Sequence, residues 1–188
     1  MLITTKKQVK TLNDVKGLKI RMPGGPPTEQ MKALGGVPMM IPMPDNYISL
    51  QKGVIDGMGA PWEAILGFRL YEVVKYYTEA PLPAVYFSVA FNKKKWNSLP
   101  KDIQNAFTSV SGLEGSKYWG RNFFDSAKDG IFQKTGVEIN YYALPDVERA
   151  KWLEVGGKPI WEQWVKSMKG KGLSDAQEIL DSALEMLK

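Results

Sequence analysis

Short apolar runs alternate with helical patterns along residues 11–78, and this alternation constrains the possible folds most. Four runs have the length and apolar content of short strands, at residues 18–22, 37–41, 54–57 and 73–78. Helical patterns begin near Pro27, at Asp45 and after Pro61. Strands and helices that alternate at this spacing pack as a parallel or mixed sheet with helices on its faces. The sequence therefore predicts an α/β lobe with a mixed sheet flanked by helices.

A proline-broken segment at residues 81–83 separates this half from a mainly helical half. Residues 84–92 form a long apolar run and are the best strand candidate in the chain. Beyond them the pattern predicts a long helical stretch, a strand and two helices, at residues 100–134, 137–142, 145–168 and 174–187. The helical spacing predicts that the tryptophans there lie in the core: Trp119, Trp152, Trp161 and Trp164. The proline break is a candidate crossing between two lobes.

The composition excludes several kinds of chemistry. The 188 residues contain no cysteine and no histidine, which rules out disulfides, a cysteine or histidine zinc site and a serine–histidine–acid triad. We expect no metal and no cofactor. Gly24 and Gly25 precede a helix, but the lysine and the serine or threonine of a P-loop are missing, and a plain turn is the better interpretation.

The formal net charge of +5 is compatible with acidic small molecules or with nucleic acid. The basic residues are scattered, however, and the single lysine run at residues 93–95 is typical of a solvated surface. We therefore expect no nucleic-acid partner. No stretch of the sequence approaches the roughly 20 apolar residues that a membrane-spanning helix needs.

Arg21 has the most informative position among the charged residues. It alternates with apolar Ile20 and Met22, so it should project from the sheet on the side opposite to them. A strand arginine is usually a surface or ion-pair residue, but at a cleft its planar fork binds a carboxylate through two donors. Trp62 follows a turn after an expected strand, where open α/β sheets bind ligands. A pocket wall and a core position both remain open for it.

Five blocks of the sequence resemble the second lobe of TRAP-type periplasmic solute-binding proteins of the dicarboxylate-binding (DctP) type. The blocks lie, in the family's order, at residues 4–23, 33–38, 47–57, 70–78 and 96–100. The last fifty or so residues match this family only in their helical character. The resemblance implies a two-lobed protein that closes over a small organic acid and delivers it to the membrane permease subunits of a TRAP transporter. It also implies a periplasmic location and no enzyme activity.

The resemblance also implies binding residues. The arginine of the first block grips the ligand carboxylate in the family, and here it is Arg21. Supporting contacts come from the loop around Met43 and from the turn at Gly59 and Ala60. At this turn many members carry Glu-Asn-Pro, whereas this chain has Gly-Ala-Pro, which favours a more apolar monocarboxylate. The remaining candidates for substrate binding are Trp62 and Phe87.

The domain organisation expected from the resemblance has three parts. Residues 1–82 form the second lobe, residues 83–126 supply a crossing strand and long helix to an incomplete first lobe, and residues 127–188 return to the second lobe. A chain of this kind would be a truncated or excised part of the family fold. Its apolar crossing strand would then recruit a second copy, giving a homo-oligomer or domain-swapped dimer with an interface in residues 84–125. A small carboxylate-handling enzyme is the alternative function, although the usual general base is missing.

Overall fold

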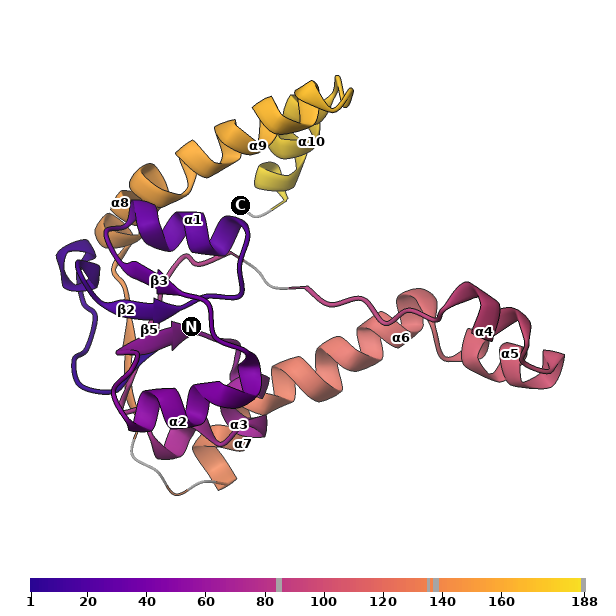
Figure 1. Ribbon diagram of the computed structural model, residues 1–188, viewed down its shortest axis with the longest axis horizontal. Helices are drawn as coiled ribbons and strands as arrows, with labels where there is room; N and C mark the ends of the chain where they lie inside the picture. The colour runs from indigo at the N-terminus through magenta and orange to yellow at the C-terminus, as the bar shows by residue number, and fades with distance from the viewer. Residues whose placement is uncertain (84–85, 135, 137–138, 187–188) are drawn as a thin grey trace. The chain divides into compact units, whose positions relative to one another are not determined.

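The computed structural model describes residues 1–83, 86–134, 136 and 139–186 (Figure 1). The chain forms two compact units. The first comprises residues 1–59, 73–83 and 139–188, and the second comprises residues 60–72 and 84–138. The predicted lobe boundaries at residues 82 and 126 refer to the complete family fold and stay a prediction. Every helix in the described ranges is too short or too polar to span a bilayer.

The first unit is built on a mixed sheet, which confirms the predicted α/β class. In the described ranges this sheet has six strands in the order β3-β2-β4-β1-β5-β6. Their bounds are Leu2–Thr4 (β1), Lys19–Arg21 (β2), Val37–Met39 (β3), Gly57–Gly59 (β4), Tyr76–Glu79 (β5) and Asn140–Ala143 (β6). Strands β3, β2 and β4 are parallel, β1 is antiparallel to β4 and β5, and β6 is parallel to β5. The predicted runs therefore form strands, although β4 begins only at Gly57 and residues 137–138 lie outside the described residues.

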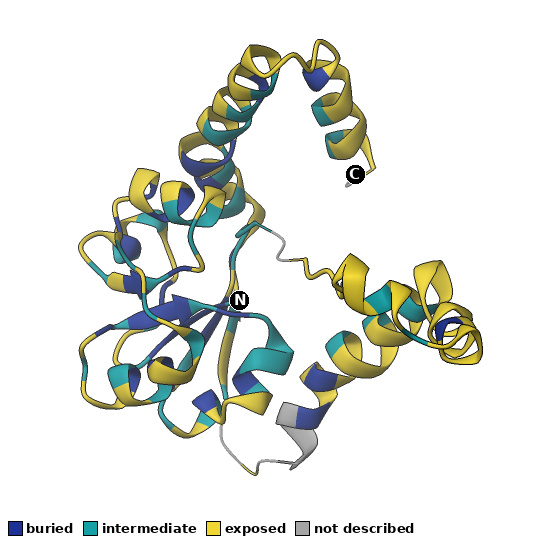
Figure 2. Ribbon diagram, turned by 45° about the vertical axis from the view of Figure 1, so that its right-hand side comes forward, coloured by how far each residue is buried: buried dark blue, intermediate teal, exposed yellow. Residues whose placement is uncertain are grey.

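Strand β1 was not predicted from periodicity. This strand has three residues, too few to display an alternating pattern, yet it lies between β4 and β5 in the middle of the sheet. All three of its side chains are buried. Figure 2 shows how strongly burial is concentrated along the strands of this unit.

The sheet is apolar on both faces. On one face the core contains Ile20 of β2 and Met22, the residue that follows this strand, together with Met31 of α1 (Pro26–Ala33) and Trp152 of α8 (Asp146–Gly156). Burial of such large side chains contributes about 1.5–3 kcal/mol each. The other face carries Met58, which is fully buried. Helix α2 (Asn46–Gln51) lies on the opposite side of this sheet from α1 (Figure 1).

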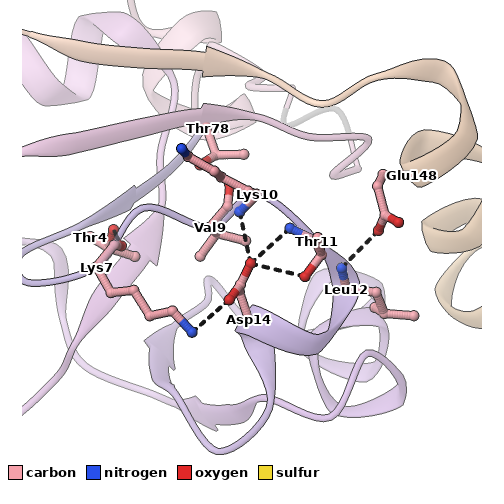
Figure 3. A network of polar contacts seen from close by, with 9 residues as sticks. All are labelled: Thr4, Lys7, Val9, Lys10, Thr11, Leu12, Asp14, Thr78 and Glu148. Carbon is pink, nitrogen blue, oxygen red and sulfur yellow. Dashed lines mark hydrogen bonds and ion pairs between the residues drawn. The ribbon is translucent and has the colours of Figure 1, made fainter.

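The loop after β1 is fastened by polar contacts (Figure 3). Asp14, in the short helix η1 (Leu12–Val15), pairs with Lys7 at 2.6 Å and accepts hydrogen bonds from the backbone N–H groups of Lys10 and Thr11 at 3.1 and 2.9 Å. The interaction with Lys7, supported by these hydrogen bonds, lowers the pKa of Asp14 to about 2. The network replaces backbone pairing along a segment that has neither strand nor long helix.

The carboxyl-terminal helices differ from the predicted pair. The stretch expected as one helix over residues 145–168 is two helices, α8 and α9 (Lys158–Gly170), separated at Gly157. Pro159 explains the break, because its ring is compatible only with the first turn of a new helix. Helix α10 (Ala176–Glu185) follows as predicted. Trp152 is buried as expected, but Trp161 and Trp164 are half-buried.

The second unit is helical. It contains α3 (Trp62–Gly67), η3 (Leu70–Glu72), α4 (Lys93–Asn97), α5 (Lys101–Ser109), α6 (Gly112–Trp119), the π-helix η4 (Gly120–Asp125) and α7 (Ser126–Lys134). The expected continuous stretch over residues 100–134 is thus interrupted between α5 and α6. Gly112, the first residue of α6, has a φ of 66°, a conformation that suits glycine and that breaks the helical path between the two helices. The buried amide of Gln104 ties α5 to the turn after α4 by donating to the carbonyls of Trp96 and Leu99, both at 3.0 Å.

Two predictions for this unit are wrong. Residues 86–92 form neither strand nor helix, and the first two residues of the expected crossing strand, 84–85, lie outside the described residues. A strand requires a neighbouring strand to accept its hydrogen bonds, and all six strands of the described ranges belong to the first unit. Trp119 is 50 % exposed and packs edge-on against Phe123, at 5.2 Å between ring centroids, instead of lying in a core.

Candidate functional site

The candidate site lies where the parallel strands β3, β2 and β4 end. Arg21 is the last residue of β2 and is aligned with Met39 of β3 and Met58 of β4. Gly59 follows Met58 at the end of β4, so it lies beside Arg21 at the same edge. The carboxyl-terminal edge of parallel strands is where open α/β sheets bind ligands, because the loops that leave the strands diverge there.

One donor of the Arg21 guanidinium already makes a hydrogen bond within the chain. Its Nε donates a hydrogen bond to the carbonyl oxygen of Ile41 at 3.0 Å. Within the described part of the chain, no ion pair joins Arg21 to an acidic side chain. The group is half-buried, and this loss of solvent lowers the pKa of Arg21. A partly desolvated cation without an acidic partner is stabilised by an incoming anion.

The orientation of Arg21 agrees with the prediction in one respect and not in another. Arg21 projects away from the core face that holds Ile20 and Met22, as the alternation predicts. The face that it shares with Met58 is nevertheless apolar and buried, whereas the alternation suggested a polar side. The apolar surroundings explain why the guanidinium is desolvated.

Met43 lies on the loop that holds Arg21. It is the first residue of the short helix η2 (Met43–Asp45), two residues beyond Ile41. Asn46, the first residue of α2, is fully buried, and its side-chain Nδ2 donates to the carbonyls of Pro42 at 3.1 Å and Met43 at 3.0 Å. The loop from Ile41 to Asn46 is therefore held at both ends, by Arg21 at one and by a buried amide at the other.

Gly59 is closely packed. A Cβ atom at this position would lie 3.0 Å from the sulfur of Met22 and 3.6 Å from Cδ1 of Leu82. Leu82 belongs to the proline-broken segment that leaves the first unit, and it packs on the core cluster of that unit. This part of the first unit thus passes close to the strand end that carries Gly59.

The other three sequence-predicted residues belong to the second unit. Ala60 is buried, and Trp62 is half-buried at the first position of α3. Phe87 is 67 % exposed and stacks on Phe124 with a centroid separation of 6.0 Å and an interplanar angle of 15°. Arg21 and Gly59 thus lie at the ends of adjacent strands, and Met43 lies on the loop that is hydrogen-bonded to Arg21. A contact of any of the six residues with one ligand stays a prediction.

Sequence reasoning missed two groups of this site. The first is the main-chain carbonyl of Ile41, which no side-chain pattern can reveal. The second is Asn46, which follows the Pro-Asp pair at an expected helix start and was assigned no role. A polar residue at the first position of a helix that otherwise carries apolar residues inward would have been a usable signal.

The groups at this edge are of kinds that bind small anions. They comprise one cationic fork, main-chain carbonyls, and thioether and glycine surfaces. No group of three potential metal-ligating side chains occurs in the described ranges. The arrangement can hold the carboxylate of a small molecule against an apolar wall.

The fold and the family comparison together place the chain in one class of protein, the bacterial solute-binding proteins. The family model for bacterial extracellular solute-binding protein, family 7 (DctP), matches residues 1–167, so the chain belongs to this family. A solute-binding protein of Sulfitobacter sp. (strain NAS-14.1) is 30% identical over 176 residues, covering 93% of this chain and 52% of the relative. The C4-dicarboxylate-binding periplasmic protein DctP of Rhodobacter capsulatus is 28% identical, covering 76% and 43%.

Solved structures give the same family. A TRAP solute-binding protein of Rhodoferax ferrireducens in complex with copurified benzoate matches with a TM-score of 0.82 and 28% identity, covering 100% of this chain and 61% of that one. A TRAP periplasmic solute-binding protein of Bordetella bronchiseptica with bound mandelate has a TM-score of 0.77 and 26% identity, covering 100% and 60%. The chain spans about half the length of the curated relatives that it matches.

Proposed function

We propose that this chain provides the carboxylate-binding part of a TRAP-type solute-binding protein, with Arg21 as the group that binds the acid. The observation that carries the proposal is the state of the guanidinium. It is half-buried at a parallel-strand edge, it is oriented by one main-chain carbonyl, and no described acidic residue pairs with it. A carboxylate would complete its fork through two parallel hydrogen bonds.

The proposed ligand is a small, mainly apolar monocarboxylate. Met43 lies on the loop next to Arg21, and the turn after β4 carries no side-chain amide or carboxylate at Gly59 and Ala60. A site without such groups forms few hydrogen bonds to hydroxyl groups of a ligand. It therefore does not prefer hydroxylated acids over plain ones. Two relatives of known structure hold benzoate and mandelate, which are acids of this kind. Trp62 and Phe87 would add aromatic surface to the same site.

The remaining partners follow from membership of the family. The proposed protein acts in the periplasm and passes its ligand to membrane permease subunits, without catalysing a reaction. In the two-lobed fold proposed here, residues 1–82 and 127–188 belong to the second lobe and residues 83–126 to the first. The exposed aromatic and aliphatic side chains between residues 86 and 123 support a further proposal, that the isolated chain associates with a second copy through this region.

Replacement of Arg21 by lysine tests the binding role. We expect Arg21→Lys to weaken the binding of sodium benzoate by about 10- to 100-fold, because a point charge replaces a two-pronged donor. Binding is followed by NMR titration, which detects even millimolar dissociation constants. The resonance of the Arg21 Nε–H group should also move when benzoate is added.

Arg149→Lys is the matched control. Arg149 lies on α8 in the same unit, where it forms a loose ion pair with Glu79 at 4.0 Å, so the substitution should leave the affinity unchanged. Equal affinities of Arg21→Lys and the wild-type chain would contradict the proposal. So would a wild-type chain that binds neither benzoate nor mandelate at millimolar concentration.

A further inference from the structure

We infer that Asn46 is a positioning residue for the carboxylate site, because its buried amide fixes the loop that orients Arg21. This inference rests on the proposed function of Arg21. Asn46 is 0 % exposed at the start of α2. Its Nδ2 donates to two carbonyls of the preceding loop, those of Pro42 at 3.1 Å and Met43 at 3.0 Å, and contacts the sulfur of Met43 at 3.5 Å.

A short covalent path connects these contacts to the guanidinium. The carbonyl of Ile41, which accepts the hydrogen bond from Arg21 Nε at 3.0 Å, belongs to the same planar peptide unit as the nitrogen of Pro42. The ring of Pro42 restricts the next dihedral, and its φ is −55°. Few soft torsions therefore separate the atom that Asn46 holds from the atom that orients Arg21. A shift of the Pro42 carbonyl is passed on to the Ile41 carbonyl.

Both loop carbonyls accept a hydrogen bond from a backbone N–H group as well, so they do not depend on this amide. The Pro42 carbonyl also accepts the backbone N–H of Asp45 at 3.1 Å, and the Met43 carbonyl accepts the backbone N–H of Asn46. The side-chain oxygen of Asn46, in contrast, is buried without a hydrogen-bond partner among the described residues. An unpaired buried oxygen is unfavourable, and a leucine of similar volume would avoid it. The amide therefore contributes more to the position of the loop than to the stability of the fold.

The test compares Asn46→Leu and Asn46→Ser with the wild-type chain. Three quantities are measured: thermal unfolding, the chemical shift and water exchange of the Arg21 Nε–H group without ligand, and the affinity for sodium benzoate. Asn46→Leu should unfold within a few degrees of the wild type, since the loss of two hydrogen bonds is offset by the removal of the unpaired oxygen. Its Arg21 Nε–H should exchange faster, and benzoate should bind about tenfold more weakly. Asn46→Ser, which keeps one short donor, should give intermediate values.

Gln51→Leu is the control, because Gln51 is exposed at the end of the same helix. An Arg21 Nε–H signal and a benzoate affinity that stay at their wild-type values in Asn46→Leu would overturn the inference. Failure of both Asn46 variants to fold would also overturn it, by assigning Asn46 to the stability of the chain. The proposed function fails separately, through an unchanged affinity of Arg21→Lys. The exchange of Arg21 Nε–H is measured without ligand and still tests the positioning role in that case.

Discussion

At the residue scale, two glycines of β4 differ in the atom that an added side chain would meet first, and this atom determines how much a substitution destabilises the fold. A Cβ atom at Gly57 would overlap the backbone carbonyl oxygen of Ile3 on the adjacent strand and would lie 2.8 Å from Cγ2 of Thr4. At Gly59 the nearest obstacle is the flexible thioether of Met22. A backbone atom in the middle of a sheet cannot move alone, whereas a methionine side chain can change rotamer.

We therefore expect unequal losses from the same chemical change. Gly57→Ala should lower the free energy of unfolding by about 3 kcal/mol or more, and Gly59→Ala by less than about 1 kcal/mol. Urea denaturation followed by circular dichroism measures both. Equal losses in the two variants would mean that the strands β1 and β4 are not as closely apposed as the register places them.

At the scale of elements, the loop between β1 and β2 depends on one carboxylate. Asp14 forms an ion pair with Lys7 and accepts hydrogen bonds from two backbone N–H groups (Figure 3). A second acid, Glu148 of α8, accepts the backbone N–H of Leu12 at 2.9 Å. The loop is thus attached both to itself and to the helix that covers the core.

The lowered pKa of Asp14 makes this contribution dependent on pH. The pKa is about 2 in the folded chain against 3.8 in the reference state, so the stabilisation is complete above about pH 4 and is lost as the pH falls toward 2. Asp14→Asn should lower the free energy of unfolding by about 1 kcal/mol at pH 7, and the difference from the wild type should shrink between pH 4 and 2. Denaturant titrations at several pH values measure it.

Glu114→Gln serves as the control for this experiment. Glu114 pairs with Lys117 on an exposed face of α6, where an ion pair contributes little. A difference between Asp14→Asn and the wild type that stays constant from pH 7 to pH 2 would show that the carboxylate charge is not what holds the loop.

At the scale of the whole molecule, the second unit has an unusual surface. Large apolar side chains are exposed along residues 86–123, among them Val110 at 69 % and Leu113 at 70 % exposure. Soluble monomers rarely expose contiguous apolar surface of more than a few hundred Å². The proposed association with a second copy would cover these side chains.

We expect the isolated chain to elute as a dimer or larger species in size-exclusion chromatography with light scattering. The double substitution Val110→Lys and Leu113→Lys should shift it to the monomer mass, because two charges would have to be buried in the interface. Val147→Lys is the control, since Val147 is equally exposed, at 69 %, but lies on α8 in the first unit. A wild-type chain that is monomeric at micromolar concentration would contradict the proposed association.

The sequence by itself determined the elements whose signal is local. The alternation around Arg21, the proline at the start of α1 and the glycine stops follow from backbone sterics and side-chain period, so β2, β3 and the helix α1 between them were predictable. The absence of cysteine and histidine likewise restricts the possible chemistry, because it depends on composition alone and not on how the chain folds.

Only the tertiary structure decided which elements pair and which side chains lose their solvent. Strand β1 is too short to carry a pattern and exists because β4 and β5 bond to it, while residues 86–92 have a strand-like pattern and no strand to pair with among the described residues. The half-burial of Arg21 depends on the buried Met58 beside it and on the Ile41 carbonyl, twenty residues along the chain. Hydrogen-bonded strands and desolvated charges both depend on partners that are distant in sequence, and a local pattern does not contain them.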